Sequence, residues 1–421
     1  MVGFVEPIEG EETMAKTYRV GFDFGNSTMV VWVEFGSQTW TMTVPTAFAK
    51  VSARQLQNLD ITMEDSAVIR LDGETVDWGI GKLVLRQSKD IWHGQGDTAR
   101  YASEHAVRGL LALVAILIPD REANLVVATG LPAETYRKNR DLRKAIAKAF
   151  TGPKKFTIDG GKTQRTFNLQ YAATLMEGAG ALGLYMDADA TLPGAVIDIG
   201  GGTTDLYVAG PDGVPQGEFC KGKEVGVVTA ERQFSDSFEE KYHFEPKPSE
   251  VKDCLYAYVN TSKAKKKPYP AIGNNGKRIE DEELEALASE AVDVTAKEIV
   301  SFVASAWRES AGSMEIGRRY SPIVLIGGGA YYFLEALRKR ITHLQRPTDA
   351  WGPVAANAAG YARAANAWLK KKLAEEAAAK KAAAAAKELE AIGQEVTIAK
   401  ELVDAATEAV EATETPSDIA G

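Results

Sequence analysis

The stretch from Ala195 to Gly210, AVIDIGGGTTDLYVAG, constrains the fold more than any other part of the chain. A short apolar run bounded by glycines is typical of a strand buried on both faces. Consecutive glycines allow backbone N–H groups to converge on an anion such as a phosphate, because no Cβ atoms intervene. Asp198 would repel a bare phosphate, so it indicates a magnesium ion between the two. The alternative for this stretch alone is a glycine-rich hairpin with a capping aspartate.

The same pattern occurs near the N-terminus, where Tyr18–Phe35 reads YRVGFDFGNSTMVVWVEF. An apolar strand again leads to an aspartate, Asp23, which is followed by a glycine turn with hydroxyl side chains and by a second apolar strand. Asp23 aligns with Asp198 if the second turn carries one extra residue. Two such hairpins predict two similar halves whose turns face each other across a cleft.

A third stretch, Pro322–Phe333, reads PIVLIGGGAYYF and predicts a buried strand, a turn at Gly327–Gly329 and the start of a helix. A helix N-terminus after a glycine turn offers free amides and the positive end of the helix dipole to a phosphate or ribose. By itself this pattern also fits an ordinary strand-to-helix turn. The three stretches together, in this order, indicate a nucleotide cleft.

These stretches resemble the two phosphate motifs and the adenosine motif of the actin, heat-shock chaperone and sugar-kinase superfamily of ATPases. Tyr171–Met186 and Ala355–Tyr361 resemble its two connecting helices, and the resemblance covers about Tyr18 to Trp368. The details are most similar to the ParM-type plasmid-segregation actins of bacteria and archaea: GFDFGNS in the first hairpin, Val44-Pro45-Thr46, Gly79-Ile-Gly-Lys82 and the AANAAGY segment. The fold that this implies is α/β, with two similar actin-like (ribonuclease H-like) domains flanking the cleft.

The chain order then predicts four parts. Residues 1–16 form a disordered extension, residues 17–188 form domain I, which is completed by residues 348–369, and residues 189–347 form domain II. Residues 370–421 form an Ala/Lys/Glu-rich tail that is helical and then disordered. Apolar residues in this tail follow heptad spacing: Leu389, Ile392, Val396, Ala399, Val403, Ala406 and Val410. We favour a solvated, partly frayed helix over the alternative of a coiled coil.

Two further helices are expected within domain I. Ala133–Phe150 predicts one basic amphipathic helix, and Tyr171–Met186 predicts the connecting helix that carries Glu177. A carboxylate in such an apolar run is costly to bury unless it is paired or used. The resemblance implies that Glu177 is catalytic and orients the attacking water, whereas the alternative is a solvent-facing glutamate.

The resemblance also implies the ligands, which are Mg²⁺ and ATP, with GTP as an alternative nucleotide. Asp23 and Asp198 are expected to be catalytic and to hold the metal through water. The phosphates are expected at Gly25, Asn26, Ser27, Thr28, Gly200, Gly201, Gly202, Thr203 and Thr204, and the nucleoside at Gly327, Gly328, Gly329 and Ala330. Lys221, Lys223 and Glu224 are weaker candidates for nucleoside contacts, because an exposed hairpin edge would use the same residue types.

Composition limits the partners. With 49 Lys and Arg against 58 Asp and Glu, the net charge of −9 argues against broad direct binding to DNA. Two cysteines fit a reducing cytoplasm, and neither a signal peptide nor an apolar run long enough to cross a membrane is evident. The basic run at residues 262–267 reads as a solvated loop. The expected location is the cytoplasm.

The function that the resemblance implies is an Mg-dependent ATPase that polymerises head-to-tail into dynamic filaments. These filaments would segregate plasmid or other DNA through a DNA-binding adaptor protein, or position cargo within the cell. One alternative is a small-molecule kinase or acyl-phosphate enzyme of the same superfamily. Another is a chaperone-like reactivating ATPase, although no segment resembles the peptide-binding domain of heat-shock chaperones.

Overall fold

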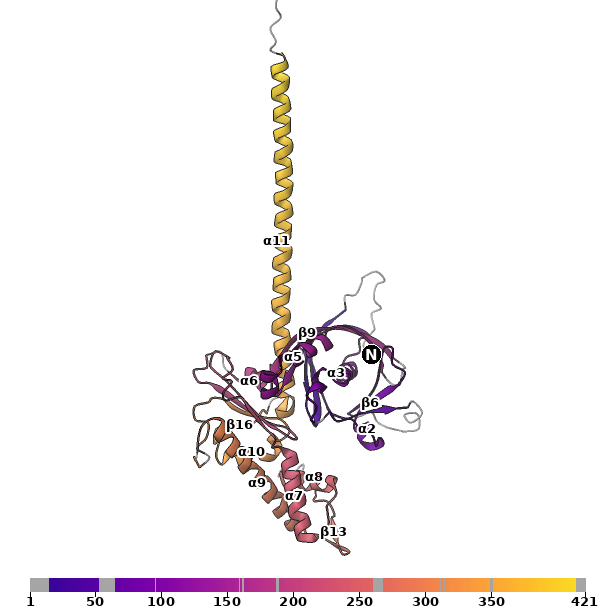
Figure 1. The fold of residues 1–421 in the computed structure, drawn as a ribbon, viewed down its shortest axis with the longest axis vertical. Helices are drawn as coiled ribbons and strands as arrows, with labels where there is room; N and C mark the ends of the chain where they lie inside the picture. The colour runs from indigo at the N-terminus through magenta and orange to yellow at the C-terminus, as the bar shows by residue number, and fades with distance from the viewer. Residues whose placement is uncertain are drawn as a thin grey trace, which may run out of the picture. The chain divides into compact units, whose positions relative to one another are not determined.

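The structure is a computed structural model that describes residues 15–52, 65–94, 96–158, 160, 163–186, 189–259, 268–310, 312–313, 315–348 and 351–413. The chain forms two compact units that divide after Asn366. Most of the predicted 1–16 extension, the basic run at 262–267 and the last residues of the tail, 414–421, lie outside the described residues. Figure 1 labels the helices and strands along the chain.

A nine-stranded sheet occupies the first half of the larger unit, in the order β3-β2-β1-β7-β9-β8-β5-β6-β4. Its strands are β1 (Thr17–Phe24), β2 (Thr28–Phe35), β3 (Gln38–Pro45), β4 (Phe48–Val51), β5 (Ser66–Leu71), β6 (Asp77–Gly81), β7 (Glu122–Leu131), β8 (Gly152–Ile158) and β9 (Thr163–Met176).

A five-stranded sheet follows, in the order β12-β11-β10-β15-β16. It contains β10 (Gly194–Ile199), β11 (Thr204–Ala209), β12 (Lys221–Lys223), β15 (Ile323–Ile326) and β16 (Leu344–Gln345). A separate two-stranded hairpin, β13 (Gly273–Asn274) and β14 (Lys277–Arg278), turns at the predicted Asn-Gly pair.

The two sheets repeat one arrangement. In the first, β1 pairs antiparallel with β2 and parallel with β7, and β7 pairs parallel with β9. In the second, β10 pairs antiparallel with β11 and parallel with β15, and β15 pairs parallel with β16. The prediction of two similar halves is therefore confirmed, whereas the residue boundaries proposed for domains I and II stay a prediction.

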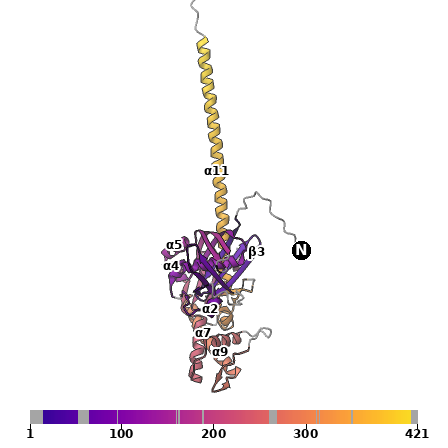
Figure 2. The same cartoon turned by 90° about the vertical axis from the view of Figure 1, so that its right-hand side faces the viewer.

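Helices cover both sheets. The first sheet packs with the short 3-10 helix η1 (Thr98–Ala102) and with α3 (Glu104–Leu117), whose side chains from Ala106 to Ala115 are buried. The second sheet packs with α7 (Val227–Tyr242), α8 (Pro248–Val259), α9 (Asp281–Ala306) and α10 (Ala330–Arg338), which share one core with it. Figure 2 shows α7 beside α9 after the turn of the view. The remaining helices are α2 (Lys82–Gln87), α4 (Ala133–Lys138), α5 (Arg140–Ala149), α6 (Ala179–Tyr185) and α11 (Gly352–Thr413).

The predicted helix Tyr171–Met186 is wrong over its first half. Residues up to Met176 form the end of β9, and only Ala179–Tyr185 is helical, as α6. The strand forms because β7 offers an open parallel edge, which pairs from Val127 opposite Tyr171 to Leu131 opposite Met176. Tertiary pairing thus overrides the helix propensity of an alanine-rich segment.

The single helix predicted over Ala133–Phe150 is also corrected, because it is two helices, α4 and α5. They are separated at Asn139, whose side-chain oxygen accepts a hydrogen bond from the backbone N–H of Leu142 at 2.9 Å. Asparagine is a strong N-cap residue, since its side chain satisfies a free N–H in the first turn. The cap starts a new helix where the amphipathic pattern suggested a continuous one.

The two connecting helices meet at glycines. A Cβ atom on Gly360 of α11 would collide with the backbone of Gly180 of α6, so only glycine allows this approach. The first part of α11 also covers the first sheet, where Ala355, Ala358 and Ala359 are buried against Val30. The small residues of AANAAGY thus allow α11 to pack closely against both α6 and the first sheet.

None of the described helices is both long enough and apolar enough to cross a membrane.

Candidate functional site

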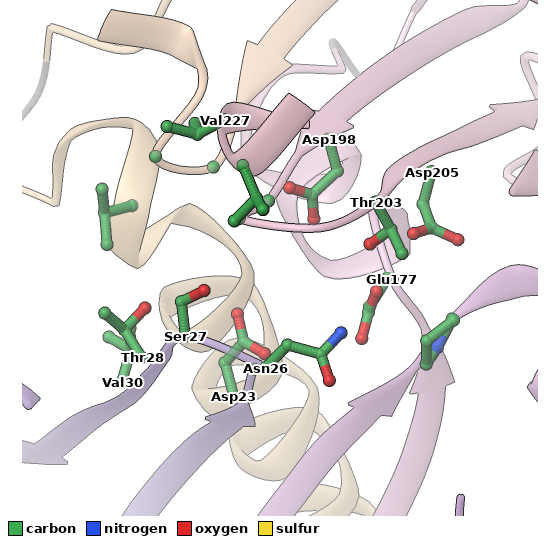
Figure 3. A pocket seen from close by; sticks show the side chains of 18 of the residues that line it. Asp23, Asn26, Ser27, Thr28, Val30, Glu177, Asp198, Thr203, Asp205 and Val227 are labelled. Atoms are coloured by element: carbon green, nitrogen blue, oxygen red, sulfur yellow. The ribbon is translucent and has the colours of Figure 1, made fainter. Parts of the chain in front are cut away.

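The two hairpin turns open into one cavity of about 360 Å³. The walls contain all three predicted carboxylates and most of the predicted turn residues: Asp23, Gly25, Asn26, Ser27, Thr28, Glu177, Asp198, Gly200, Gly201, Thr203, Gly327 and Gly328. Figure 3 shows side chains from both sheets pointing into the same space. The structure therefore brings together residues that lie far apart in the sequence.

The first turn is held from outside the hairpin. The Gly25 carbonyl accepts hydrogen bonds from Thr46 Oγ1 at 2.8 Å and from Arg100 Nη1 at 3.1 Å. The backbone N–H of Thr46 donates to the carbonyl of Ser27 at 3.0 Å. These bonds use the carbonyl groups of Gly25 and Ser27. They therefore fix the conformation of the turn without using its backbone N–H groups.

The second turn is closed by its own backbone and by the start of α7. The Gly200 N–H donates to the Thr203 carbonyl at 2.8 Å, and the Val228 N–H donates to the Gly201 carbonyl at 2.8 Å. A Cβ atom on Gly201 would collide with Ser27 Oγ of the first turn. The two turns thus face each other at close range, as the repeated sequence pattern predicts.

The third glycine turn lies against the second. Gly327 has a φ of +80°, and a Cβ atom there would lie 2.5 Å from Asp198 Oδ1. The Gly329 N–H donates to the Ile199 carbonyl at 2.8 Å, and the Gly327 N–H donates to the Pro353 carbonyl at 2.9 Å. Glycine at position 327 therefore satisfies both an unusual backbone conformation and the close approach of a carboxylate.

Glu177 follows the last residue of β9, and its backbone N–H donates to the Leu131 carbonyl at 2.8 Å. The next residue, Gly178, is left-handed, and its N–H donates to Asn357 Oδ1 at 3.0 Å. Glu177 thus reaches the cavity from a strand end and not from the helix that the sequence predicted. The turn at Gly178 separates it from α6.

Five carboxyl groups line this cavity, and four of them repel one another. Burial, together with the charge of Asp198, raises the pKa of Asp23 and of Asp205 to about 7 each. Burial raises the pKa of Asp198 to about 6, although its bond with Asn357 lowers it. Burial and the charges of Asp205, Asp23 and Asp198 raise the pKa of Glu177 well above its ordinary value. Repulsion of this kind is typical of a site that holds a cation.

Two polar side chains from distant segments support the carboxylates. Asn357 Nδ2 donates to Asp198 Oδ2 at 2.7 Å. Arg100, which is buried, donates to the Tyr101 hydroxyl at 2.7 Å and lowers the pKa of Asp23 through its charge. These contacts orient Asp198 and partly offset the charge on Asp23.

The sequence did not assign a role to several residues of this site. Asp205 lies in the second hairpin, near the start of β11 and three residues after Gly202, and a carboxylate this close to the glycine turn is a signal of a site. Asn357 is a polar residue within an alanine run, and this exception in the pattern also marks it as a candidate site residue. No local pattern distinguishes Arg100, Tyr101, Glu231, Lys252 and Tyr332, which line the same cavity.

Some of the predicted residues lie elsewhere. Gly202, Thr204, Gly329 and Ala330 are not among the lining residues, and Thr204 Oγ1 donates to the Val225 carbonyl at 2.7 Å in the protein interior. Lys223 and Glu224 line a neighbouring cavity of about 320 Å³ that shares Arg100 and Asp205 with the first. Lys221 lines neither cavity.

The carboxyl groups of this cavity fit a magnesium ion that is held through water and phosphate oxygens. Among the described residues, no three His, Cys, Asp or Glu side chains lie close enough to hold a metal ion by themselves. Of the residues that the structure describes, five carboxyl groups but only two cationic side chains, Arg100 and Lys252, line the cavity. A polyanion would be repelled by this excess of acid unless a divalent cation came with it.

Comparison with known proteins shows a similar domain and a similar fold. Residues 21–180 match the family model described as the N-terminal domain of actin-like proteins. Comparison with curated proteins gave no match. Residues 21–180 are therefore similar to that domain, and the two sheets have the arrangement of the actin-like fold.

Several solved structures have a similar fold. An archaeal actin homologue, Ta0583, is 22% identical with a TM-score of 0.64, over 82% of this chain and 98% of that one. The same homologue in complex with ADP is 21% identical, with a TM-score of 0.61, over 83% and 99%. The ParM of a 15-stranded filament from Clostridium botulinum is 18% identical, with a TM-score of 0.63, over 84% and 99%. The predicted resemblance to ParM-type actins is confirmed at the level of the fold.

Proposed function

We propose that the cavity binds ATP with Mg²⁺ and that the chain hydrolyses it. The observation that carries this proposal is the meeting of two glycine turns and four carboxyl groups in one cavity. The turns offer backbone N–H groups to phosphates, and the excess of acid requires a cation between them. The archaeal homologue bound to ADP supports a nucleotide in this fold.

Each residue then has a distinct task. The phosphates are held by Gly25–Thr28, Gly200, Gly201 and Thr203. Asp23 and Asp198 hold the water shell of the metal. Bound magnesium neutralises charge that develops on the phosphates. Glu177 accepts a hydrogen bond from the attacking water and orients it, and Gly327 and Gly328 support the nucleoside. Catalysis then consists of positioning and electrostatic stabilisation.

We further propose that nucleotide state controls self-assembly. Head-to-tail contacts use two different surfaces of one chain, and such contacts produce an open polymer if they do not close into a ring. The likeness to a ParM filament protein supports this assembly. In this proposal the filament acts in the cytoplasm and carries plasmid or other DNA through an adaptor, because the net charge of −9 disfavours direct contact with DNA.

Light scattering at 90° together with sedimentation tests the proposal. Scattering should rise when Mg-ATP is added to the wild-type protein and should decay as ATP is consumed. In Glu177→Ala it should rise and persist, because hydrolysis is lost while nucleotide binding is kept. The matched control is Glu285→Ala, which removes an exposed carboxylate on α9 and should behave as wild type. ATP turnover that requires an added small molecule, with no scattering, would favour a kinase instead.

A further inference from the structure

The described part of the smaller unit, residues 367–413, is a helix with opposite charges on its two halves. Residues 367–387 contain six lysines and two glutamates, a net charge of +4, whereas residues 388–413 contain seven acidic residues and one lysine, a net charge of −6. All of these residues belong to α11. At 1.5 Å per residue, this part of the helix is about 70 Å long. A helix of this kind carries a basic end and an acidic end.

Side-chain size changes along the helix in the same way. Apart from Leu373, which is 54% exposed, the described uncharged side chains between residues 373 and 385 of the basic half are alanines, among them Ala378, Ala382 and Ala385, all exposed. The acidic half presents larger aliphatic side chains, and Ile398, Leu402 and Val403 are 57%, 67% and 63% exposed. Exposed aliphatic side chains at helical spacing favour burial against a partner.

We propose that this helix pairs in antiparallel orientation with the same helix of a second copy of the chain. Antiparallel pairing sets the basic half of each helix against the acidic half of the other, so opposite charges attract at both ends. It also sets the alanines against the larger aliphatic side chains. Parallel pairing would instead set lysines against lysines, acidic residues against acidic residues, and alanine against alanine.

One register sets a small side chain against a larger one at both ends of the pair. When Ala378 lies opposite Val403, the two-fold symmetry of the pair repeats this contact. Lys380 and Glu401 are then level, but each lies two residues, or about 200° of rotation, from the contact position, so the two side chains face away from the partner helix and attract only at a distance. Lys381 and Lys400 are level with each other and carry like charges. Within each helix, Lys371 pairs with Glu375 at 3.9 Å, one turn away. This inference goes beyond the proposed function, since it requires neither nucleotide nor filament.

Cysteine cross-linking of the full chain, without nucleotide, tests the orientation. Ala378→Cys protein and Val403→Cys protein are oxidised separately and as a mixture, and the native Cys220 and Cys254 are buried. The mixture should give a cross-linked dimer that contains one copy of each variant, whereas each variant alone should give none. A mixture of Ala383→Cys with Val403→Cys is the control, because position 383 faces another side of the helix.

Two results would overturn the proposal. If each single variant cross-links to itself, the helices are parallel. If no mixture cross-links and sedimentation equilibrium gives a monomer, the helices do not pair. In that case, binding of the full chain to vesicles that contain phosphatidylserine, or to duplex DNA, would identify the basic half as a contact for anions.

Ionic strength provides an independent measurement. Association should weaken several-fold as sodium chloride is raised, because salt screens the attraction between the basic half of one helix and the acidic half of the other. If association does not change with salt, charge complementarity does not select the orientation.

Discussion

Replacing Asp23 with asparagine should stabilise the nucleotide-free protein at neutral and alkaline pH. The folded protein raises the pKa of Asp23 from its ordinary 3.8 to about 7. Its contribution to stability is therefore fully present below pH 4 and is lost as pH rises to 7, where the carboxylate ionises beside Asp198. Since one pKa unit corresponds to about 1.4 kcal/mol, the loss reaches up to about 4 kcal/mol. Asp23→Asn removes this loss.

Urea unfolding followed by tryptophan fluorescence, at intervals between pH 5 and pH 8, measures the effect. The wild-type protein should lose unfolding free energy over this range, and Asp23→Asn should lose less and be the more stable protein at pH 8. The control is Asp253→Asn, which changes an exposed aspartate on α8 and should keep the wild-type slope. A variant that is less stable than wild type at pH 8, or that keeps the same slope, would refute the argument from carboxylate repulsion.

Two further substitutions follow from the packing and the charges. Gly360→Ala should lower the free energy of unfolding by about 1–3 kcal/mol, because the added Cβ collides with the Gly180 backbone. Gly183→Ala is the control and should leave the free energy of unfolding unchanged, because there is open space at its Cβ. Urea unfolding compares the two variants. Arg100→Met should raise the pKa of Asp23 further, because in the wild-type protein the guanidinium charge of Arg100 lowers that pKa. The loss of stability with pH should then move to higher pH in the same assay, and an unchanged midpoint would contradict that role.

Local patterns were enough to predict the centre of the site. Glycine runs that interrupt apolar strands determine where turns form, and an aspartate beside each turn indicates the chemistry. The repeat of Asp23 and Asp198 on equivalent strands predicted that the halves face each other, and both side chains line the cavity.

The errors came from contacts that no local pattern encodes. The segment before Glu177 is alanine-rich, yet it forms a strand because β7 presents a pairing edge. Arg100 reaches the Gly25 carbonyl across 75 residues of sequence, and Asn357 reaches Asp198 across 159. Only the folded chain brings such pairs together, so tertiary structure was needed to identify them.

The central claim is that the cavity takes a nucleotide together with a divalent cation. A titration of the full chain with a fluorescent ATP analogue, with Mg²⁺ and then with excess chelator, tests it most directly. The account predicts saturable binding with Mg²⁺ that weakens at least tenfold in the chelator, and loss of this metal dependence in Asp198→Asn. Equal affinity with and without Mg²⁺, or no binding under either condition, would contradict it.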